Sequence, residues 1–253
     1  MQARTAAMGT VPMAKGEVRA STTTFNANER ATMNLARLLQ LASPALPVGA
    51  YTYSQGFEWA VEVGTVKDEA TALRWIGDQL EWNLGRFEAP LLAQMMAAWS
   101  QGAGDMEIDA RYLASRETSE LRAETLQMGY SLRRLLIELD DLPAEFMAQV
   151  AVPTAPTFAY VWTGVATAWD IPPAEALTAW LWSWAENQVM AALKAVPLGQ
   201  AAGQRILLKI GGRIPAVVER AMALDDDNYS NFAPGFAIAC ARHETQYSRL
   251  FRS

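Results

Sequence analysis

The side chains best suited to binding a metal lie near the end of the sequence, where Cys240 and His243 are three positions apart and Glu244 follows directly. On a helix this spacing places the thiol and the imidazole on one face, and a thiolate, an imidazole and a carboxylate together suit a soft divalent ion. A lone Cys–His pair is weak evidence, because strong transition-metal sites usually use three or more protein ligands. Structural packing is the competing interpretation, and we expect no tight metal site in the isolated chain.

Motifs for phosphate binding and for nucleophilic catalysis are absent from the sequence. It contains neither a G-x-x-x-x-G-K-S/T loop nor a G-x-G-x-x-G loop, and it has no G-x-S-x-G nucleophile elbow. With His243 as its one histidine, it cannot form a His-rich zinc or di-iron centre. The carboxylates of Glu117 and Glu120 favour a solvated face over an acid/base couple, because nothing near them in sequence marks a cleft. We expect no catalytic residues, and an enzyme with its own active site is the weaker hypothesis.

A polar triplet, Glu186, Asn187 and Gln188, stands in the middle of the stretch from Ala176 to Val196, which is apolar on nearly every side. The tryptophans of this stretch point in different directions at about 100° per residue, so we expect a central helix that other helices cover. A buried polar group costs roughly 1–3 kcal/mol unless it is hydrogen-bonded. The triplet therefore forms either a satisfied core network or a subunit interface or polar passage.

Composition limits the classes of partner and compartment. The chain has 253 residues, of which 51% are hydrophobic, and a net charge of −6, which disfavours a nucleic-acid or anionic-membrane partner. A single cysteine and an N-terminus without the apolar core of a signal peptide favour the cytoplasm. The uncharged stretch from Phe146 to Trp169 is interrupted by Pro153 and Pro156, and the remaining helix is too short to cross a bilayer.

Hydrophobic periodicity predicts helices through most of the chain. Residues 1–32 show no apolar period and are interpreted as a flexible extension, and residues 33–253 as one all-α domain, a bundle of about eight to ten helices. Pro90 predicts a kink or the first turn of a new helix, and Gly211, Gly212 and Pro215 predict a bend. The predicted helical segments are Asn34–Ala42, a stripe from Leu73 to Trp99 capped by Asp68, Glu117–Leu139, Thr157–Trp169, the central helix, a stripe from Leu207 to Ala221, and Phe236–His243.

Two segments outside these helices have the composition of binding surfaces. The loop from Pro44 to Gly56 concentrates prolines, glycines and tyrosines, which favours recognition over packing; alternatively, its tyrosines cover the core. The segment from Thr245 to Ser253 combines aromatic residues with arginines, as interface hot spots do. By itself this tail is expected to be poorly ordered and to fold on binding. The alternative is that Leu250 and Phe251 dock onto the chain's own bundle.

Four segments of the sequence resemble one known family, the urease accessory protein UreF. They are LLQLASPALPVGAYTYSQGFEWAVE, SRETSELRAETLQMGYSLRRLL, WAENQVMAALKAVPLGQAAGQR and RHETQYSRLFRS, and they occur in the order of the family from about Leu35 to Ser253. The first segment departs from the family pattern: Gln55 stands where many members have a histidine, which weakens a metal role for this loop.

The resemblance implies an all-helical homodimer that is not itself an enzyme. Members of the family bind the accessory protein UreD, also called UreH, and recruit the GTPase UreG, and the assembly delivers nickel to apo-urease. Nickel would then be handled by the assembled complex, with no cofactor held tightly by this chain. The alternative is a helical scaffold without a gating role. As hypotheses, the UreG side would comprise Pro44, Pro47, Gly49, Tyr51, Tyr53 and Gln55; the UreD side Tyr247, Arg249, Leu250, Phe251 and Arg252; and the interface or polar path Glu186, Asn187 and Gln188.

Overall fold

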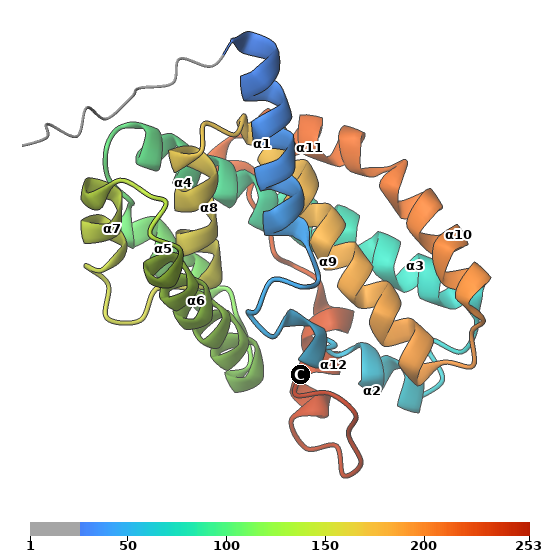
Figure 1. The fold of residues 1–253 in the computed structure, drawn as a ribbon. Helices are drawn as coiled ribbons and strands as arrows, with labels where there is room; N and C mark the ends of the chain where they lie inside the picture. Colours follow the sequence, from blue (N-terminus) through green and yellow to red (C-terminus); the bar gives the residue numbers. More distant parts are fainter. Residues whose placement is uncertain (1–25) are drawn as a thin grey trace, which may run out of the picture.

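A computed structural model describes residues 26–253, which form an all-α bundle, as expected (Figure 1). No β-strand occurs in this part of the chain, and none of its helices is both long and apolar enough to span a membrane. The elements are α1 (Ala27–Ala42), the 3₁₀ turn η1 (Ala50–Thr52), α2 (Phe57–Glu62), α3 (Glu69–Gln79), the π-helix η2 (Leu80–Glu88), α4 (Ala89–Ser100), α5 (Met106–Ala114), α6 (Ser119–Leu139), α7 (Ala144–Val150), α8 (Phe158–Ala168), α9 (Pro173–Ala195), α10 (Gln200–Gly211), α11 (Ile214–Met222), the 3₁₀ turn η3 (Asp226–Asn228) and α12 (Pro234–His243).

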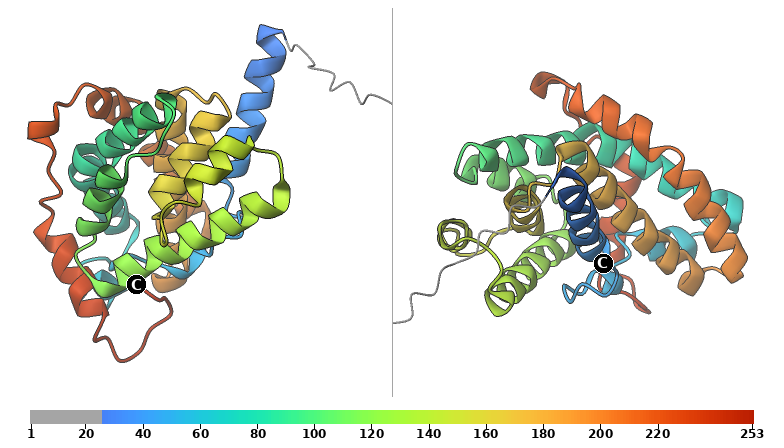
Figure 2. Two further views of the ribbon diagram at one scale, coloured as in Figure 1. Left: turned by 90° about the vertical axis from the view of Figure 1, so that its left-hand side faces the viewer. Right: turned by 45° about the horizontal axis from the view of Figure 1, so that its top comes forward.

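The first helix begins earlier than predicted, at Ala27 instead of Asn34. Asn26 caps it: its side chain accepts a hydrogen bond from the Glu29 N–H, and the Glu29 carboxylate accepts one from the Asn26 N–H. This capping box starts the helix where no apolar period exists, because this end of α1 projects from the bundle into solvent (Figure 2). The predicted extension is therefore corrected at residues 27–32, and its residues 1–25 lie outside the part that the structure describes.

The central helix α9 organises the bundle, packing against α1, α2, α3, α4, α8, α10 and α11 (Figure 1). Its Trp180 stacks on Phe158 and meets Trp162 edge-on, each at 5.2 Å between ring centroids. The expectation that α9 is covered on all sides is wrong for one stripe, because Thr178, Trp182 and Met190 are exposed. Their successive spacings are four and eight positions, so they follow one side of the helix.

The packing of α6 against the start of α8 is close at Gly129. A Cβ at this position would come within 3.0 Å of backbone atoms of Pro156, Thr157 and Phe158. Thr157, completely buried, caps α8 by accepting from the Tyr160 N–H, and its own hydroxyl donates to Asp109 of α5. These contacts hold α5, α6 and α8 together as one wall of the interior.

The stripe predicted from Leu73 to Trp99 is divided into α3, η2 and α4. Pro90 stands in the first turn of α4, so of the two predicted outcomes, a kink or a new helix, the structure shows the new helix. The preceding nine residues form a π-helix, a geometry that is rare outside functional or strained segments. At its end, Glu88 points into the core and is only 5% exposed. The bend expected at Gly211, Gly212 and Pro215 is the break between α10 and α11.

Candidate functional site

The loop of residues 44–56 crosses one end of α9 and makes its turns with backbone conformations that suit glycine. Gly49 and Gly56 have φ values of 84° and 75°, and Gln55 has 52°. At Gly56 a Cβ would also lie 2.8 Å from the Cys240 backbone nitrogen, so this position brings the loop against α12. Pro44, Pro47 and Tyr51 are exposed, whereas Tyr53 is buried and belongs to the core. The predicted recognition residues therefore divide between surface and interior.

The tail of residues 245–253 is docked onto this loop. The Arg252 N–H donates to the Thr52 carbonyl at 2.8 Å, and the Ser54 N–H donates to the Ser253 backbone oxygen at 2.7 Å. The Phe251 side chain is 7% exposed, whereas Leu250 is 70% exposed. The structure therefore shows the alternative arrangement, in which the end of the tail docks on its own chain through backbone hydrogen bonds and the burial of Phe251, and the order of the free tail stays a prediction. Of the two residues named in the alternative, only Phe251 docks.

A cluster of three side chains, which we call the tail clasp, binds the tail to the bundle. Its members are Glu58, Glu120 and His243. The Glu58 carboxylate accepts from the Leu250 N–H at 2.7 Å and from the Phe251 N–H at 3.1 Å. Glu120 pairs with Arg249 at 2.6 Å. The His243 ring is fully buried between the two carboxylates, with Nδ1 2.7 Å from Glu120 Oε2 and Nε2 3.3 Å from Glu58 Oε2. A ring nitrogen that carries a hydrogen therefore has a carboxylate acceptor on its own side of the ring, so the clasp joins α2, α6 and α12 beneath the tail.

The contacts of His243 in the tail clasp argue against metal binding by Cys240 and His243. Both ring nitrogens face carboxylate oxygens, and Cys240 is buried, which raises the pKa of its thiol. A thiolate is the metal-binding form, so burial works against ligation by Cys240. Across residues 26–253, no three His, Cys, Asp or Glu side chains are arranged to hold a metal ion.

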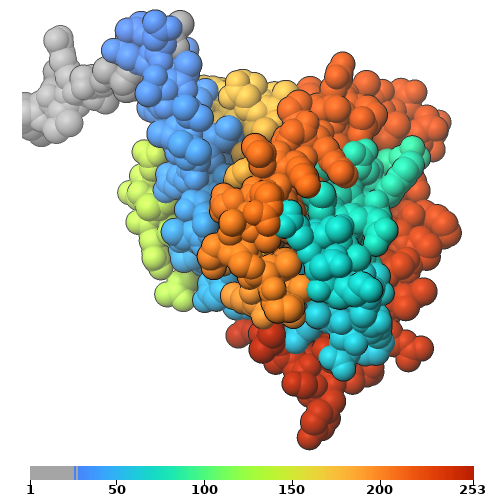
Figure 3. Space-filling model, turned by 90° about the vertical axis from the view of Figure 1, so that its right-hand side faces the viewer, coloured from blue at the N-terminus to red at the C-terminus, as the bar shows by residue number. Residues whose placement is uncertain are grey.

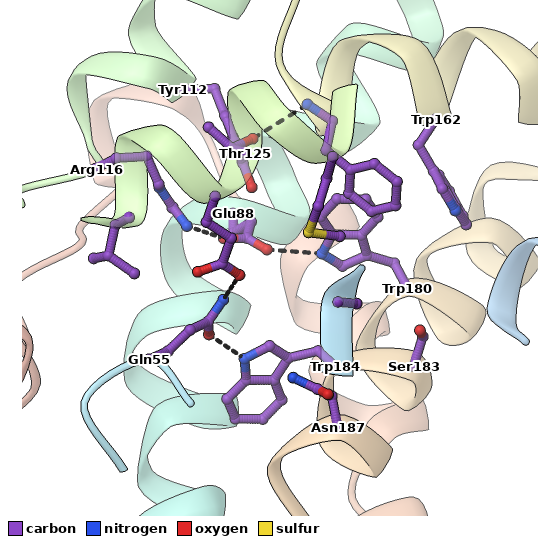
Figure 4. Close-up of a pocket in the computed structure, with 15 residues that line it drawn as sticks. Gln55, Glu88, Tyr112, Arg116, Thr125, Trp162, Trp180, Ser183, Trp184 and Asn187 are labelled. Atoms are coloured by element: carbon purple, nitrogen blue, oxygen red, sulfur yellow. Dashed lines mark hydrogen bonds and ion pairs between the residues drawn. The ribbon is translucent and has the colours of Figure 1, made fainter. Parts of the chain in front are cut away.

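A cavity of about 80 Å³ lies under the loop, between α5, α6, α8 and α9 (Figure 4). On one wall the Glu88 carboxylate accepts from Trp180 Nε1 at 2.7 Å and pairs with Arg116 at 2.9 Å. On the opposite side Gln55 accepts from Trp184 Nε1 at 2.8 Å and donates to Glu124 Oε1 at 2.7 Å. Burial raises the pKa of the Glu124 carboxyl to about 7. The cavity thus combines mainly apolar walls with a charged pair and with a carboxyl whose pKa burial raises towards neutrality.

The predicted triplet on α9 does not act as one network. Asn187 lines the cavity and donates to the Tyr53 carbonyl at 3.0 Å, which ties the loop to α9. Glu186 is partly buried, which raises the pKa of its carboxyl, and it lines a neighbouring cavity of about 110 Å³ near Tyr51. Gln188 is 1% exposed, and its Nε2 has no hydrogen-bond partner among residues 26–253. The three side chains thus lie in different surroundings: Asn187 at the cavity under the loop, Glu186 at the neighbouring cavity and Gln188 in the core.

Sequence reasoning missed the carboxylates that organise the site, namely Glu58, Glu88, Glu120 and Glu124. The solvated face expected for the Glu117 and Glu120 pair is wrong for Glu120, which faces His243. A signal was available: Glu124 falls in phase with the buried stripe of α6, where an ionisable residue requires a partner. Its partners Gln55 and Ser253 are 69 and 129 positions away, so the pattern alone does not identify them.

Comparison with known proteins agrees with the resemblance in the sequence. The UreF family model matches residues 66–211. The urease accessory protein UreF of Azoarcus sp. (strain BH72) is 63% identical over 224 residues, covering 87% of this chain and 95% of the relative. Those of Dechloromonas aromatica and Methylobacillus flagellatus are 61% and 52% identical, each over 87% of this chain and 98% of the relative. This chain therefore belongs to the UreF family of urease accessory proteins.

Proposed function

We propose that this protein is a non-catalytic urease maturation factor that bridges UreD, also called UreH, and the GTPase UreG, and thereby modulates nickel delivery to apo-urease in the cytoplasm. The observation that carries the proposal is the junction of loop and tail. Backbone hydrogen bonds between Thr52 and Arg252 and between Ser54 and Ser253 make two segments, far apart in sequence, into one surface. A partner that grips one segment therefore acts on the other.

Exposed aromatic and arginine side chains surround this junction. Tyr51 on the loop is 61% exposed, and Tyr247, Leu250 and Arg252 on the tail are exposed as well. Aromatic and arginine residues of this kind anchor protein interfaces. We assign the tail to UreD and the loop to UreG, so that UreD binding sets the state of the surface that UreG meets.

The test is co-purification of the full chain with UreD and UreG. Tyr51→Ala is expected to retain UreD and to lose most UreG, whereas Leu250→Ala is expected to weaken UreD capture. Tyr130→Ala is the matched control, because Tyr130 is also an exposed tyrosine but lies on α6 outside both segments. Wild-type recruitment of both partners by the Tyr51 and Leu250 variants would remove the assignment.

An apolar groove supports the proposal that the protein acts as a homodimer. The groove measures about 570 Å³ and lies between α1, α9 and α10, with Leu39, Trp182 and Leu208 on its rim. Figure 3 shows α1 and α10 side by side on this face. Leu208 is 78% exposed. An exposed apolar patch beside the helices α1 and α9 suits a two-fold contact in which the same surface of two copies meets.

The dimer is tested by the molar mass of the isolated chain. Leu208→Glu is expected to convert a dimeric mass in light scattering to a monomeric one, while Ile137→Glu, an equally apolar and exposed residue on α6, leaves the mass unchanged. A monomeric wild-type protein, or a dimer that survives Leu208→Glu, would oppose this surface.

The proposed role in nickel delivery assigns the chemistry to the partners. We infer that the isolated chain holds no tight nickel, since no three His, Cys, Asp or Glu side chains among the described residues are arranged to hold a metal ion and Cys240 is buried. A stoichiometric, submicromolar nickel titration that disappears in Cys240→Ser, His243→Ala would overturn this inference. GTP hydrolysis by UreG with and without the chain separates a gating factor from a scaffold: an unchanged rate favours the scaffold.

A further inference from the structure

One carboxyl group, that of Glu124 on α6, connects the loop to the tail. Its Oε1 accepts a hydrogen bond from Gln55 Nε2 at 2.7 Å, and its Oε2 accepts one from the Ser253 hydroxyl at 3.1 Å. Gln55 in turn accepts from Trp184 of α9 (Figure 4). A single titratable group thus joins segments from the beginning, middle and end of the described chain.

Burial opposes the ionisation of Glu124 and outweighs the hydrogen bonds from Gln55 and Ser253, which favour the ionised carboxylate. The side chain lies in the wall of the 80 Å³ cavity and is 7% exposed as a residue. Its charged neighbours are Glu88 of η2, which opposes a second negative charge, and Arg116, which favours one but is already paired with Glu88 at 2.9 Å. The other titratable groups facing it, Tyr112 of α5 and Cys240 of α12, are neutral near pH 7, because burial raises the pKa of both.

We propose that Glu124 is a proton-controlled latch: its neutral carboxyl keeps the loop and tail docked on α6, and its ionisation favours their release and the entry of water. A neutral carboxyl retains both partners in the closed form: its carbonyl oxygen accepts from Gln55, and its hydroxyl donates to Ser253 once the serine hydroxyl, which donates to the ionised carboxylate, has rotated to accept. An ionised carboxyl adds a second buried negative charge opposite Glu88, and opening the loop and tail relieves this by hydration.

The direction of the pH dependence follows from linkage. In the closed form the pKa of Glu124 is raised to about 7, above its ordinary value of 4.5. The closed form is therefore favoured in full below pH 4.5 and loses this preference as the pH rises to 7. If the open form has the ordinary pKa, the ratio of open to closed molecules increases on the order of 20-fold between pH 5.5 and pH 7.5.

The experiment measures amide hydrogen exchange in the full, isolated chain at several pH values. The reporters are the N–H groups of Ser54 and Arg252, whose hydrogen bonds join loop and tail. Glu124→Gln supplies the reference, because its amide mimics the neutral carboxyl and because the intrinsic pH dependence of exchange cancels in the ratio to wild type. We expect that ratio to rise about 20-fold from pH 5.5 to pH 7.5, and Glu117→Gln, an exposed glutamate nearby, to behave as wild type.

Equal pH profiles for wild type and Glu124→Gln would overturn the latch. If Glu124→Gln does not fold, carbon-13 carboxyl titration of Glu124 in the wild-type chain decides the matter instead: a midpoint near 7 supports the latch, and one below 5.5 overturns it. No partner is present in either experiment, so a negative result leaves the proposed function untouched. One consequence rests on the proposed function: if the tail binds UreD, protonation of Glu124 controls how much of the tail is free to bind it.

Discussion

Replacing Glu58 by glutamine changes one atom of the tail clasp and should release the tail. In the wild type, the two carboxylate oxygens accept from the N–H groups of Leu250 and Phe251 and face His243. The amide oxygen of glutamine still accepts from one of the two N–H groups, but its NH₂ group, itself a donor, faces the other N–H group. A hydrogen bond to a charged group contributes about 1.5–3 kcal/mol, and a buried donor left without an acceptor costs about 1–3 kcal/mol. Because the tail opens locally and regains water, we expect a net loss of about 2–4 kcal/mol in its docking.

Hydrogen exchange of the tail measures this loss directly. At 1.4 kcal/mol for each factor of ten, the expected loss makes exchange at Leu250 and Phe251 about 30- to 700-fold faster. The free energy of global unfolding should fall by less, because the tail opens separately from the bundle. Glu62→Gln is the matched control, since Glu62 is an exposed glutamate at the end of the same helix. Unchanged exchange at both amides in a folded Glu58→Gln protein would refute the assignment of Glu58 as the residue that holds the tail.

Further expected outcomes concern the core. Gly129→Ala should lower the free energy of unfolding by about 1–3 kcal/mol, because its Cβ meets backbone atoms that cannot rotate away, whereas Gly235→Ala has open space and should change it by less than about 0.5 kcal/mol; equal effects in urea denaturation would contradict the packing argument. Arg116→Met should cost about 3–5 kcal/mol, because Glu88 stays buried with only Trp180 as a donor. Adding Glu88→Leu to Arg116→Met should recover much of that loss, and a double variant as unstable as the single one would show that the pair is not the cause. Trp180→Phe should cost about 1.5–3 kcal/mol through the lost bond to Glu88, and an unchanged denaturation midpoint would argue against that bond.

The sequence by itself determined the helical class and the main helices. The 3.6-residue period of α6 and the apolar length of α9 are local properties, so they were readable without a partner. Thr157 and Pro90 marked helix starts for the same reason, since capping and the missing proline N–H act within one turn. The short helices α2, α5 and α7 were not predicted, because a few residues of a helix carry too little periodic signal.

The tertiary structure alone decided how the candidate site is assembled. The pattern marked the loop and the tail as unusual segments, but their junction depends on hydrogen bonds between residues about 200 positions apart. Likewise, the buried polar atoms of Glu58, Glu120 and His243 are satisfied only by one another and by the tail, because a buried polar group needs a hydrogen-bond partner and here distant parts of the chain supply it. Periodicity reports which face of an element is buried. It does not report which element covers that face, and in this protein the choice of neighbour decides that the tail docks against α6 and that burial raises the pKa of Glu124 to about 7.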